Sequence, residues 1–285
     1  GEWSHFTQTW EDGGTHRVYR NGVEVGSTSV GSVSYSGNEL IIARQQENNQ
    51  RYTHADIDDV RIYDNALSDS QVQELYNSYQ DFENPRHQYT LDETSGSTAV
   101  DSAGSIDGVI NDATLGVSGA TDKTGTAYSL DGSNDNIVVG SDSSFSPQQF
   151  SITVWIKATG NLDNGTYNNV SPVSKWGSTA NEYLIWTTAQ DGYQLSLRVR
   201  DGLDSDATIS RSSLDGTWNH VAAVFDGSSK MYLNGSKKDQ GQSIGDFSRD
   251  TAQNFRIGSY ASDKYFQGEI DDVRFYDIAL TDSQV

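Results

Sequence analysis

The chain has 285 residues, and its 40 acidic and 19 basic side chains give a formal net charge of −21. So negative a chain is unsuited to binding a nucleic-acid backbone or anionic lipid, because both need Lys and Arg. The lack of cysteine excludes disulfides and zinc–thiolate sites, and no apolar run approaches the roughly 20 residues of a membrane helix.

The first 80 residues predict short strands followed by one helix. Asn21-Gly22 is a strong hairpin signal, because both central residues of a type I′ turn need positive φ. Residues 68–71, Ser-Asp-Ser-Gln, have the spacing of a capping box and predict the start of a helix. An apolar stripe then follows at helical spacing: Val72, Leu75, Tyr76 and Tyr79. Residues 81–86, which contain Pro85, are predicted to be a linker.

Strand signals dominate the rest of the chain. They are short alternating or β-branched runs bounded by Gly, Asn, Asp and Ser. In the last run, alternation predicts Ile270, Asp272, Arg274 and Tyr276 on one face, opposite Asp271, Val273 and Phe275. The predicted strands are residues 127–130, 136–139, 150–158, 182–187, 194–200, 219–226, 230–233, 255–259 and 269–276.

A duplication organises the chain. Residues 55–72 (ADIDDVRIYDNALSDSQV) match residues 268–285 (GEIDDVRFYDIALTDSQV) at 13 of 18 positions. Upstream, GEWSH at residues 1–5 matches GTWNH at 216–220, and Asn21-Gly22 matches Asn234-Gly235. The period is that of a whole domain. We therefore expect residues 1–80 to be the C-terminal part of a first domain and 87–285 to be a second, cut from a longer tandem array. The alternative is that residues 1–80 form a small domain of their own.

The second copy resembles the laminin-G-like, concanavalin A-like jelly-roll family. The resemblance implies an all-β sandwich of two antiparallel sheets in tandem copies, with a short C-terminal helix in each domain. It also implies a structural Ca²⁺ and recognition of glycans or cell surfaces. The residues that carry it are HQYTLDE (87–93), DSAG (101–104), YSLDGSND (128–135), SITVWI (151–156), GTWNHVA (216–222), YLNG (232–235) and GEIDDVR (268–274).

The same resemblance implies metal ligands among the aspartates. Similar folds hold Ca²⁺ with the acid that begins the final strand, here Asp271, whose first-copy counterpart is Asp58. A loop near the first strands contributes further oxygens, and we assign this role to Asp131–Asp135. Hard oxygen donors suit Ca²⁺. Further candidates are Asp101 and Asp272. The alternative reading is a solvated acidic surface.

Aromatic residues outside the shared motifs are candidates for sugar binding. Sugar rings stack on exposed aromatic faces while polar groups bind the hydroxyls. For some of these residues, burial in the core is an equally good interpretation. Three sequons would carry glycans if the protein is exported, at Asn164, Asn169 and Asn234. The candidate ligand-binding residues are Tyr167, Trp176, Tyr183, Trp186, Tyr260 and Tyr265.

Catalysis is not expected. The repeated Trp-x-His at Trp218 and His220 has no partner nucleophile, so we interpret the tryptophan as packed and the histidine as hydrogen-bonded. We interpret Trp155 as a core residue. Glycosidases need two suitably spaced carboxylates, yet residues 85–285 contain only Glu93, Glu182 and Glu269 as glutamates.

The sequence therefore favours a non-catalytic tandem module outside the cell, at a cell or virion surface. Its expected partner is a cell-surface glycan or polysaccharide. One alternative is a structural spacer in a surface filament, cell-wall protein or viral fibre of a saline habitat, where copies contact one another. Another is an accessory carbohydrate-binding module of a secreted glycosidase.

Overall fold

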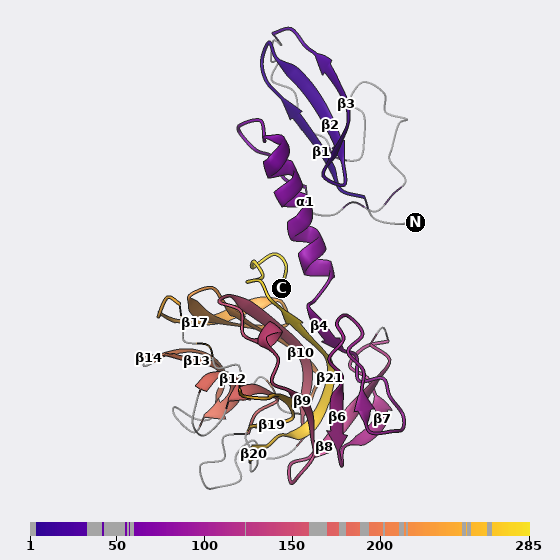
Figure 1. Ribbon diagram of the computed structural model, residues 1–285, viewed down its shortest axis with the longest axis vertical. Helices are drawn as coiled ribbons and strands as arrows, with labels where there is room; N and C mark the ends of the chain where they lie inside the picture. Colours follow the sequence, from indigo (N-terminus) through magenta and orange to yellow (C-terminus); the bar gives the residue numbers. More distant parts are fainter. Residues whose placement is uncertain are drawn as a thin grey trace. The chain divides into compact units, whose positions relative to one another are not determined.

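The computed structural model divides the chain into two compact units, residues 1–80 and 81–285, which are drawn in Figure 1. Each unit is considered separately. The residues that the structure describes are 4–32, 42, 55, 57, 60–122, 124–159, 170–176, 181–188, 194–201, 203–210, 214, 216–246, 249, 252–260 and 264–285. Among them, no helix has both the length and the apolar character required to cross a bilayer.

The first unit contains a three-stranded antiparallel sheet and the start of a helix. The strands β1 (Phe6–Trp10), β2 (Thr15–Arg20) and β3 (Val23–Ser29) pair in chain order. The Asn21-Gly22 turn joins β2 to β3, and both residues have positive φ as predicted. Helix α1 (Asp69–Glu83) begins at the predicted capping box. There the backbone N–H of Ser68 donates to Gln71 Oε1 at 2.9 Å. The helix continues three residues into the predicted linker, so residues 81–83 are helical.

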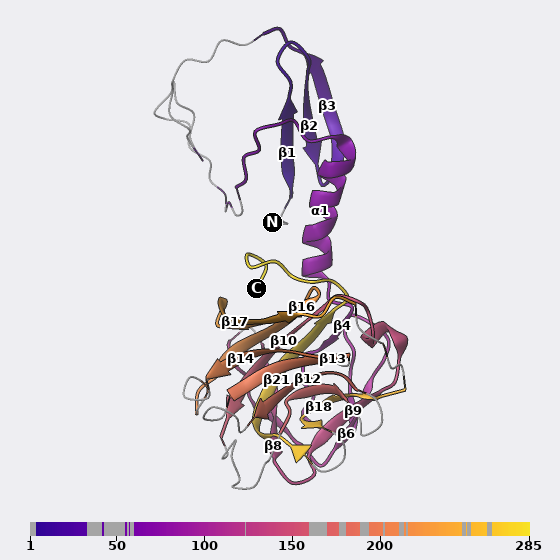
Figure 2. The same cartoon turned by 90° about the vertical axis from the view of Figure 1, so that its left-hand side faces the viewer.

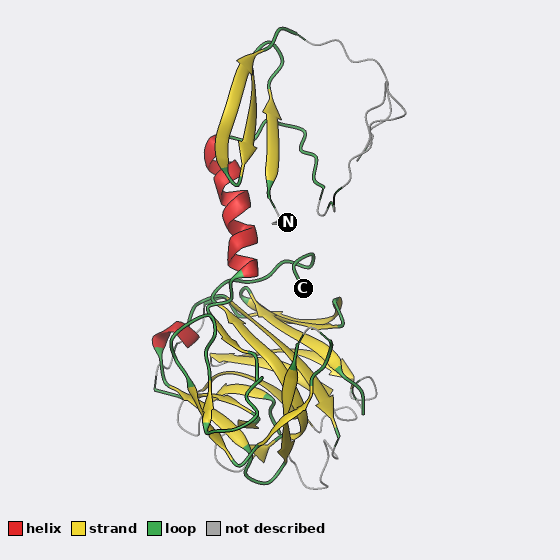
Figure 3. Ribbon diagram, turned by 90° about the vertical axis from the view of Figure 1, so that its right-hand side faces the viewer, coloured by secondary structure: helices red, strands yellow, loops and turns green. Residues whose placement is uncertain are grey.

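The second unit is a sandwich of two eight-stranded antiparallel sheets (Figures 2 and 3). In the first, called the β10–β21 sheet, the spatial order is β17 (Ser236–Ser243), β16 (Ser228–Leu233), β15 (Asn219–Phe225), β10 (Phe150–Ala158), β21 (Gln267–Tyr276), β8 (Thr126–Asp131) and β7 (Thr114–Ser118), with β4 (His87–Tyr89) also paired to β21. In the second, called the β12–β13 sheet, the order is β14 (Leu203–Ser210), β13 (Gln194–Asp201), β12 (Asn181–Thr188), β11 (Val173–Trp176), β18 (Phe255–Ile257), β9 (Asn136–Gly140), β6 (Gly108–Asn111) and β5 (Thr98–Ala99). A hairpin of β19 (Ser259–Tyr260) and β20 (Lys264–Tyr265) and a short 3-10 helix η1 (Ser143–Phe145) complete the described elements.

The core lies between the two sheets and follows the two-residue period of the strands. Ile152, Val154 and Ile156 of β10 face it from one sheet, and Leu195 and Leu197 of β13 face it from the other. Burial of such side chains stabilises the fold by roughly 1.5–3 kcal/mol each. The predicted all-β, two-sheet antiparallel sandwich is confirmed.

Strand β21 departs from the predicted alternation at one point. The register of β10 against β21 shifts between Thr153 and Trp155, and Asp272 has a φ of +43°. This is a β-bulge, which adds one residue to a strand and exchanges the faces beyond it. Ile270 consequently lies in the core together with Val273 and Phe275. The prediction that placed Ile270 on the opposite face from these two residues was wrong, because sequence alternation does not reveal a bulge.

Candidate functional site

The outer face of the β12–β13 sheet carries paired arginines and aspartates beside two indole rings. In β13, the odd-numbered residues 195–199 fill the core, so Arg198 and Arg200 point outward. The register places Arg198 opposite Asp206 and Arg200 opposite Asp204 on β14. We call this set the arginine–tryptophan face: Trp176, Trp186, Arg198, Arg200, Asp204 and Asp206.

Each arginine on this face makes a two-point ion pair. Arg198 Nε and Nη2 donate to the two carboxylate oxygens of Asp206 at 2.8 and 2.7 Å. Arg200 donates likewise to Asp204 at 2.5 and 2.8 Å. The bond from Arg200 is the main cause that holds the pKa of Asp204 below its ordinary value. Such pairs fix planar guanidinium groups in one orientation, and their remaining donor and acceptor sites can serve a ligand.

The guanidinium groups also lie against the two indole rings. Arg198 Cζ is 4.4 Å from the centroid of the Trp186 ring, and Arg200 Cζ is 5.1 Å from that of Trp176. Trp176 is only 6% exposed, whereas Trp186 is half-buried. Among the described residues, no group accepts a hydrogen bond from the buried indole Nε1 of Trp186. Of the two rings, Trp186 is therefore the more exposed.

The other aromatic candidates lie in different settings. Tyr183 is fully buried, and its hydroxyl donates to the carbonyl of Phe145 at 2.8 Å. The prediction of Tyr183 as a ligand-binding residue was therefore wrong, since alternation along β12 turns it inward. Tyr260 is half-buried on the β19–β20 hairpin and close enough to Arg200 to contribute to its raised pKa, after the larger effect of Asp204.

Several predicted site residues are not part of the arginine–tryptophan face. Tyr265 pairs with Ser259 across the small hairpin and is half-buried. Asn234 is exposed in the Asn-Gly turn, where its Oδ1 accepts from the backbone of His220. Three candidates lie outside the described residues: Tyr167, Asn164 and Asn169.

The predicted metal ligands do not gather in one place. Asp131 lies opposite Gln267 in the β21–β8 register, four positions along the strand from Asp271. Its backbone N–H donates to Asp135 Oδ2 at 2.8 Å, so these two acids close a turn of their own. Asp272 pairs with Arg274 at 2.8 Å. Asp58 lies outside the described residues, within which no three acidic or histidine side chains form a metal-sized cluster.

Asp271 alone keeps the character of a cation ligand. It is fully buried, Oδ2 accepts from the backbone N–H of Ala120 at 2.8 Å, and Oδ1 has no partner within the described part of the chain. Burial raises the pKa of Asp271 to about 6, against the opposing effect of hydrogen bonds from Ala120 and Thr124. An unpartnered buried carboxylate oxygen is costly unless a cation or donor meets it.

The segment facing Asp271 is the 119–125 turn between β7 and β8. It is closed so tightly that a Cβ on Gly119 would lie 2.5 Å from the Gly125 carbonyl and 3.0 Å from Asp271 Oδ2. An unpartnered carboxylate oxygen beside this turn is compatible in chemistry with Ca²⁺, which accepts carboxylate and main-chain oxygens. Sequence reasoning chose the loop at Asp131–Asp135 instead. The Gly119 and Gly125 pair was the available signal for a tight turn in this segment.

His87, Asp101 and Ser144 have the spacing of a hydrolase triad. His87 Nδ1 is 2.6 Å from Asp101 Oδ2, and His87 Nε2 is 2.8 Å from Ser144 Oγ. The amides that would have to form an oxyanion hole are occupied, since those of Ser144 and Phe145 both donate to Asp142. The arrangement therefore fits a structural role, in which His87 joins β4 to η1.

Both carboxylate oxygens of Asp101 accept hydrogen bonds within the fold. Besides His87, it accepts from the backbone N–H groups of Gln88, Gly104 and Ile106 at 2.8–3.1 Å. Although burial raises the pKa of Asp101, the bond to His87 and these three bonds lower it below the ordinary value. The prediction of Asp101 as a metal ligand is not supported, because its oxygens are already satisfied.

A hollow of about 660 Å³ opens on the outer face of the β10–β21 sheet. Trp155 lies there with its ring centroid 5.2 Å from that of His220, and both are half-buried. The predicted core position of Trp155 was wrong, because Val154 and Ile156 take the inward face. Burial lowers the pKa of His220, and Asp272 opposes this effect. The lining residues are Thr153, Trp155, Trp218, His220, Asn234, Asp272, Arg274, Tyr276, Gln284 and Val285.

Comparison with known proteins gives one family and several similar structures. The family model described as Concanavalin A-like lectin/glucanases superfamily matches residues 1–73 and 131–285. A search of curated proteins gave no match. Domain 4 of AbnA, a GH43 extracellular arabinanase from Geobacillus stearothermophilus, solved in complex with arabinotriose, is 25% identical. That similarity covers 70% of this chain and 96% of that one, with a TM-score of 0.50.

Two further binding domains are similar in fold. The binding domain of botulinum neurotoxin serotype D is 16% identical over 73% of this chain and 50% of that chain, with a TM-score of 0.54. The binding domain of Paraclostridial Mosquitocidal Protein 1 is 18% identical over 72% of this chain and 51% of that one, with a TM-score of 0.53. The chain thus spans about half the length of these two.

Proposed function

Because the chain belongs to the concanavalin A-like lectin/glucanases superfamily, we propose that its second unit is a non-catalytic module that binds a glycan or polysaccharide. The observation that carries this proposal is the arginine–tryptophan face. It combines the half-buried Trp186 ring with oriented guanidinium and carboxylate groups. An indole can stack against the C–H face of a sugar, while charged and polar groups exchange hydrogen bonds with its hydroxyls.

The arabinanase domain supports this class of ligand. Its structure contains arabinotriose, a neutral oligosaccharide, and the similarity extends over 96% of that domain. The two toxin domains support the fold alone. We therefore expect a neutral oligosaccharide or polysaccharide rather than a charged one, and pentose polymers are the first to be tested.

The surroundings of the glutamates favour binding over hydrolysis. Glu182 is fully buried in an ion pair with Lys175 at 3.1 Å, and Glu269 pairs with Lys157 at 3.0 Å. Glu93 accepts from the hydroxyl of Tyr128 at 2.5 Å. Each carboxylate thus has a structural partner, whereas glycoside hydrolysis needs two that flank a bound sugar.

We also propose a structural Ca²⁺ at Asp271 and the main-chain oxygens of the 119–125 turn. The ion would supply positive charge to a buried carboxylate and fix the connection from β7 to β8. Added Ca²⁺ should raise Tm and a chelator should lower it, and Asp271→Asn should abolish both effects. Asp131→Asn is the control and should keep them. A Tm response to Ca²⁺ that survives in Asp271→Asn would contradict this assignment.

We place the protein outside the cell, at a cell or virion surface. The arabinanase that contains the similar domain is extracellular, and hydrated acidic surfaces suit salty or Ca²⁺-rich surroundings. Surface labelling of intact cells of the source organism tests this point, and we expect the protein to be labelled without lysis of the cells.

The binding proposal is tested by calorimetric titration of the full chain with arabino-oligosaccharides and a panel of other neutral oligosaccharides. Trp186→Ala and Arg198→Ala should each weaken binding at least tenfold. The matched control is Trp218→Ala, which removes a tryptophan from the opposite sheet and should leave affinity unchanged, with folding of every variant checked by circular dichroism. If Trp218→Ala removes binding and Trp186→Ala does not, the ligand lies in the hollow. If no oligosaccharide binds, a spacer role replaces recognition.

A further inference from the structure

The hollow on the β10–β21 sheet has a counterpart in the first unit, where the occupant is visible. The duplication maps His220 onto His5, Tyr232 onto Tyr19, and the segment 281–285 onto 68–72. The strands β15 and β16 of the second unit correspond in the same way to β1 and β2. The two copies can therefore be compared bond by bond.

Three pairs of hydrogen bonds show that the two places are built alike. The backbone N–H of His5 donates to Asn21 Oδ1 at 2.9 Å, and that of His220 donates to Asn234 Oδ1 at 2.9 Å. A hydroxyl–carboxylate bond joins Tyr19 to Asp69 at 2.6 Å and Tyr232 to Asp282 at 2.7 Å. The capping bond from Ser68 N–H to Gln71 Oε1 is repeated from Thr281 N–H to Gln284 Oε1, both at 2.9 Å.

In the first unit, the body of α1 lies over this surface. Val72 is fully buried, and the ring of Tyr76 stacks on His5 with 6.1 Å between centroids. A Cβ on Gly22 would meet the side-chain amide of Gln73 at 2.8 Å. The helix thus covers the histidine and the adjoining Asn-Gly turn together.

In the second unit, the same surface is open. A Cβ on Gly235, the equivalent of Gly22, would meet no atom within 4 Å. Val285, the equivalent of Val72, is only half-buried, and it lines the hollow together with Gln284, His220 and Trp218. The hollow is therefore the surface of the second unit that corresponds to the one α1 covers in the first.

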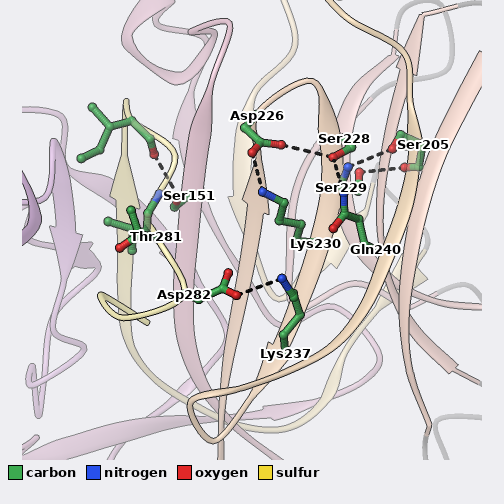
Figure 4. A network of polar contacts seen from close by, with 12 residues as sticks. Ser151, Ser205, Asp226, Ser228, Ser229, Lys230, Lys237, Gln240, Thr281 and Asp282 are labelled. Carbon is green, nitrogen blue, oxygen red and sulfur yellow. Dashed lines mark hydrogen bonds and ion pairs between the residues drawn. The ribbon is translucent and has the colours of Figure 1, made fainter.

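The segment that would lead into such a helix is already fixed in position. Ser151 Oγ donates to the carbonyl of Ile278 at 2.9 Å and accepts from the backbone N–H of Leu280 at 2.8 Å. Asp282 then pairs with Lys237 at 2.9 Å (Figure 4). Leu280 is buried against the outer face of the sheet, next to Tyr232 and Tyr276. These contacts hold the cap at the rim of the hollow, so a helix that follows it starts next to the hollow.

We infer that the hollow is a seat for an amphipathic helix, and that it is not a ligand pocket. The occupant is a helix of the α1 kind that continues directly from the 281–284 cap. An aromatic side chain, placed four residues after the valine as Tyr76 is, lies against His220 and the neighbouring tryptophans. Their amphipathic rings and the Asp272–Arg274 pair suit such a partly polar, partly aromatic helix face.

The test is to extend the full chain after Val285 with a copy of its own residues 73–83, QELYNSYQDFE. The extended chain should unfold about 4 °C or more above the original chain, because a tyrosine and its neighbours become buried. Acrylamide quenching of tryptophan fluorescence should also decrease as the hollow is covered. A second extension, in which the first tyrosine of the added segment is serine, should give less than half of the rise in Tm.

Three results would overturn the inference. They are an unchanged Tm and unchanged quenching in the extended chain, an equal rise with the serine-containing or a scrambled extension, and a sugar that protects Trp218 from quenching and is displaced by the extension. The first two would show that the hollow does not select this helix, and the third would show that it is a ligand site. None of these measurements depends on binding at the arginine–tryptophan face, so the two proposals can fail separately.

Discussion

The repeated motif near the end of each copy differs in structure between the two units, in the residues that the structure describes. Residues 267–276 form the central strand β21, in which Ile270, Val273 and Phe275 are at most 1% exposed. In the first copy, the described residues 57 and 60–63 form no strand, and Val60 and Ile62 are 53% and 71% exposed. Nearly identical residues are therefore a core strand in one place and a surface segment in the other.

The difference lies in what surrounds them. Strand β21 is paired with β10, β8 and β4, which come from residues 87–158. Among the described residues of the first copy, the strands are β1, β2 and β3, which correspond to β15, β16 and β17. Strand preference depends on neighbouring strands and on burial more than on the residues themselves. The comparison teaches that the motif forms a core strand where neighbouring strands flank it, and that its described first-copy residues remain exposed without them.

The largest expected difference between the two copies is in the stability loss caused by one charge placed at equivalent positions. Val273→Asp puts a carboxylate into the core and should destabilise the second unit by more than about 4 kcal/mol, or prevent its folding. Val60→Asp should change stability by less than roughly 0.5 kcal/mol, because that side chain is exposed. Urea unfolding followed by circular dichroism measures both. Equal losses in the two variants would mean that the first copy also buries this segment.

A smaller effect concerns the buried pair of Asp101 and His87, which only the second unit has among the described residues. The folded-state pKa of Asp101 lies below its ordinary value, so its stabilisation is present above about pH 4 and is lost as the pH falls through the folded pKa. Asp101→Asn should cost about 3 kcal/mol at neutral pH.

The pH dependence of Tm tests this assignment. The gap between the Asp101→Asn variant and the original chain should narrow as the pH falls below about 4. Asp64→Asn, at an exposed acid of the first unit, is the control and should follow the original curve throughout. A gap that stays constant down to pH 2 would show that folding does not lower the pKa of Asp101.

The smallest effect sharpens what the two copies share. Tyr19→Phe and Tyr232→Phe each remove one hydroxyl bond to a carboxylate, of 2.6 and 2.7 Å. Each substitution should lower the free energy of unfolding by about 1–2 kcal/mol, and the two losses should be equal within error. Amide hydrogen exchange of β2 and of β16 measures the stability of the first and the second unit separately. A loss confined to one unit would show that the matching bonds are not equivalent.

Much of the fold could be predicted from local patterns. Alternating apolar residues gave β10 at residues 150–158, and the capping box gave the start of α1. Two long strands were missed, because β14 and β17 consist mainly of Ser, Asp, Lys, Gln and other residues of low strand preference. They lie at adjoining edges of the two sheets. Most of β17 is exposed, whereas β14 buries Ala207 and Ile209, so its apolar alternation is short.

The candidate site was predictable in part. Trp176 and Trp186 stood out as aromatic residues outside the shared motifs, but the arginines beside them did not. Their pattern was nevertheless present, since Arg198 and Arg200 mirror Asp206 and Asp204 about the turn between β13 and β14. Recognising it requires the strand register, which sets which side chains face each other. The turn that faces Asp271 was not chosen, although its Gly119 and Gly125 pair indicated a tight turn.

The bulge at Asp272 also has a consequence for how the chain finds its native alignment. A strand of strict alternation can slip by two residues against its neighbours and still present apolar side chains to the core. In β21, the halves before and after the bulge are out of phase, so a slipped strand would bury acids from one half whenever the other half matched. The extra residue therefore fixes the register of β21. One alignment satisfies both halves of the central strand, and slipped alignments are disfavoured during folding.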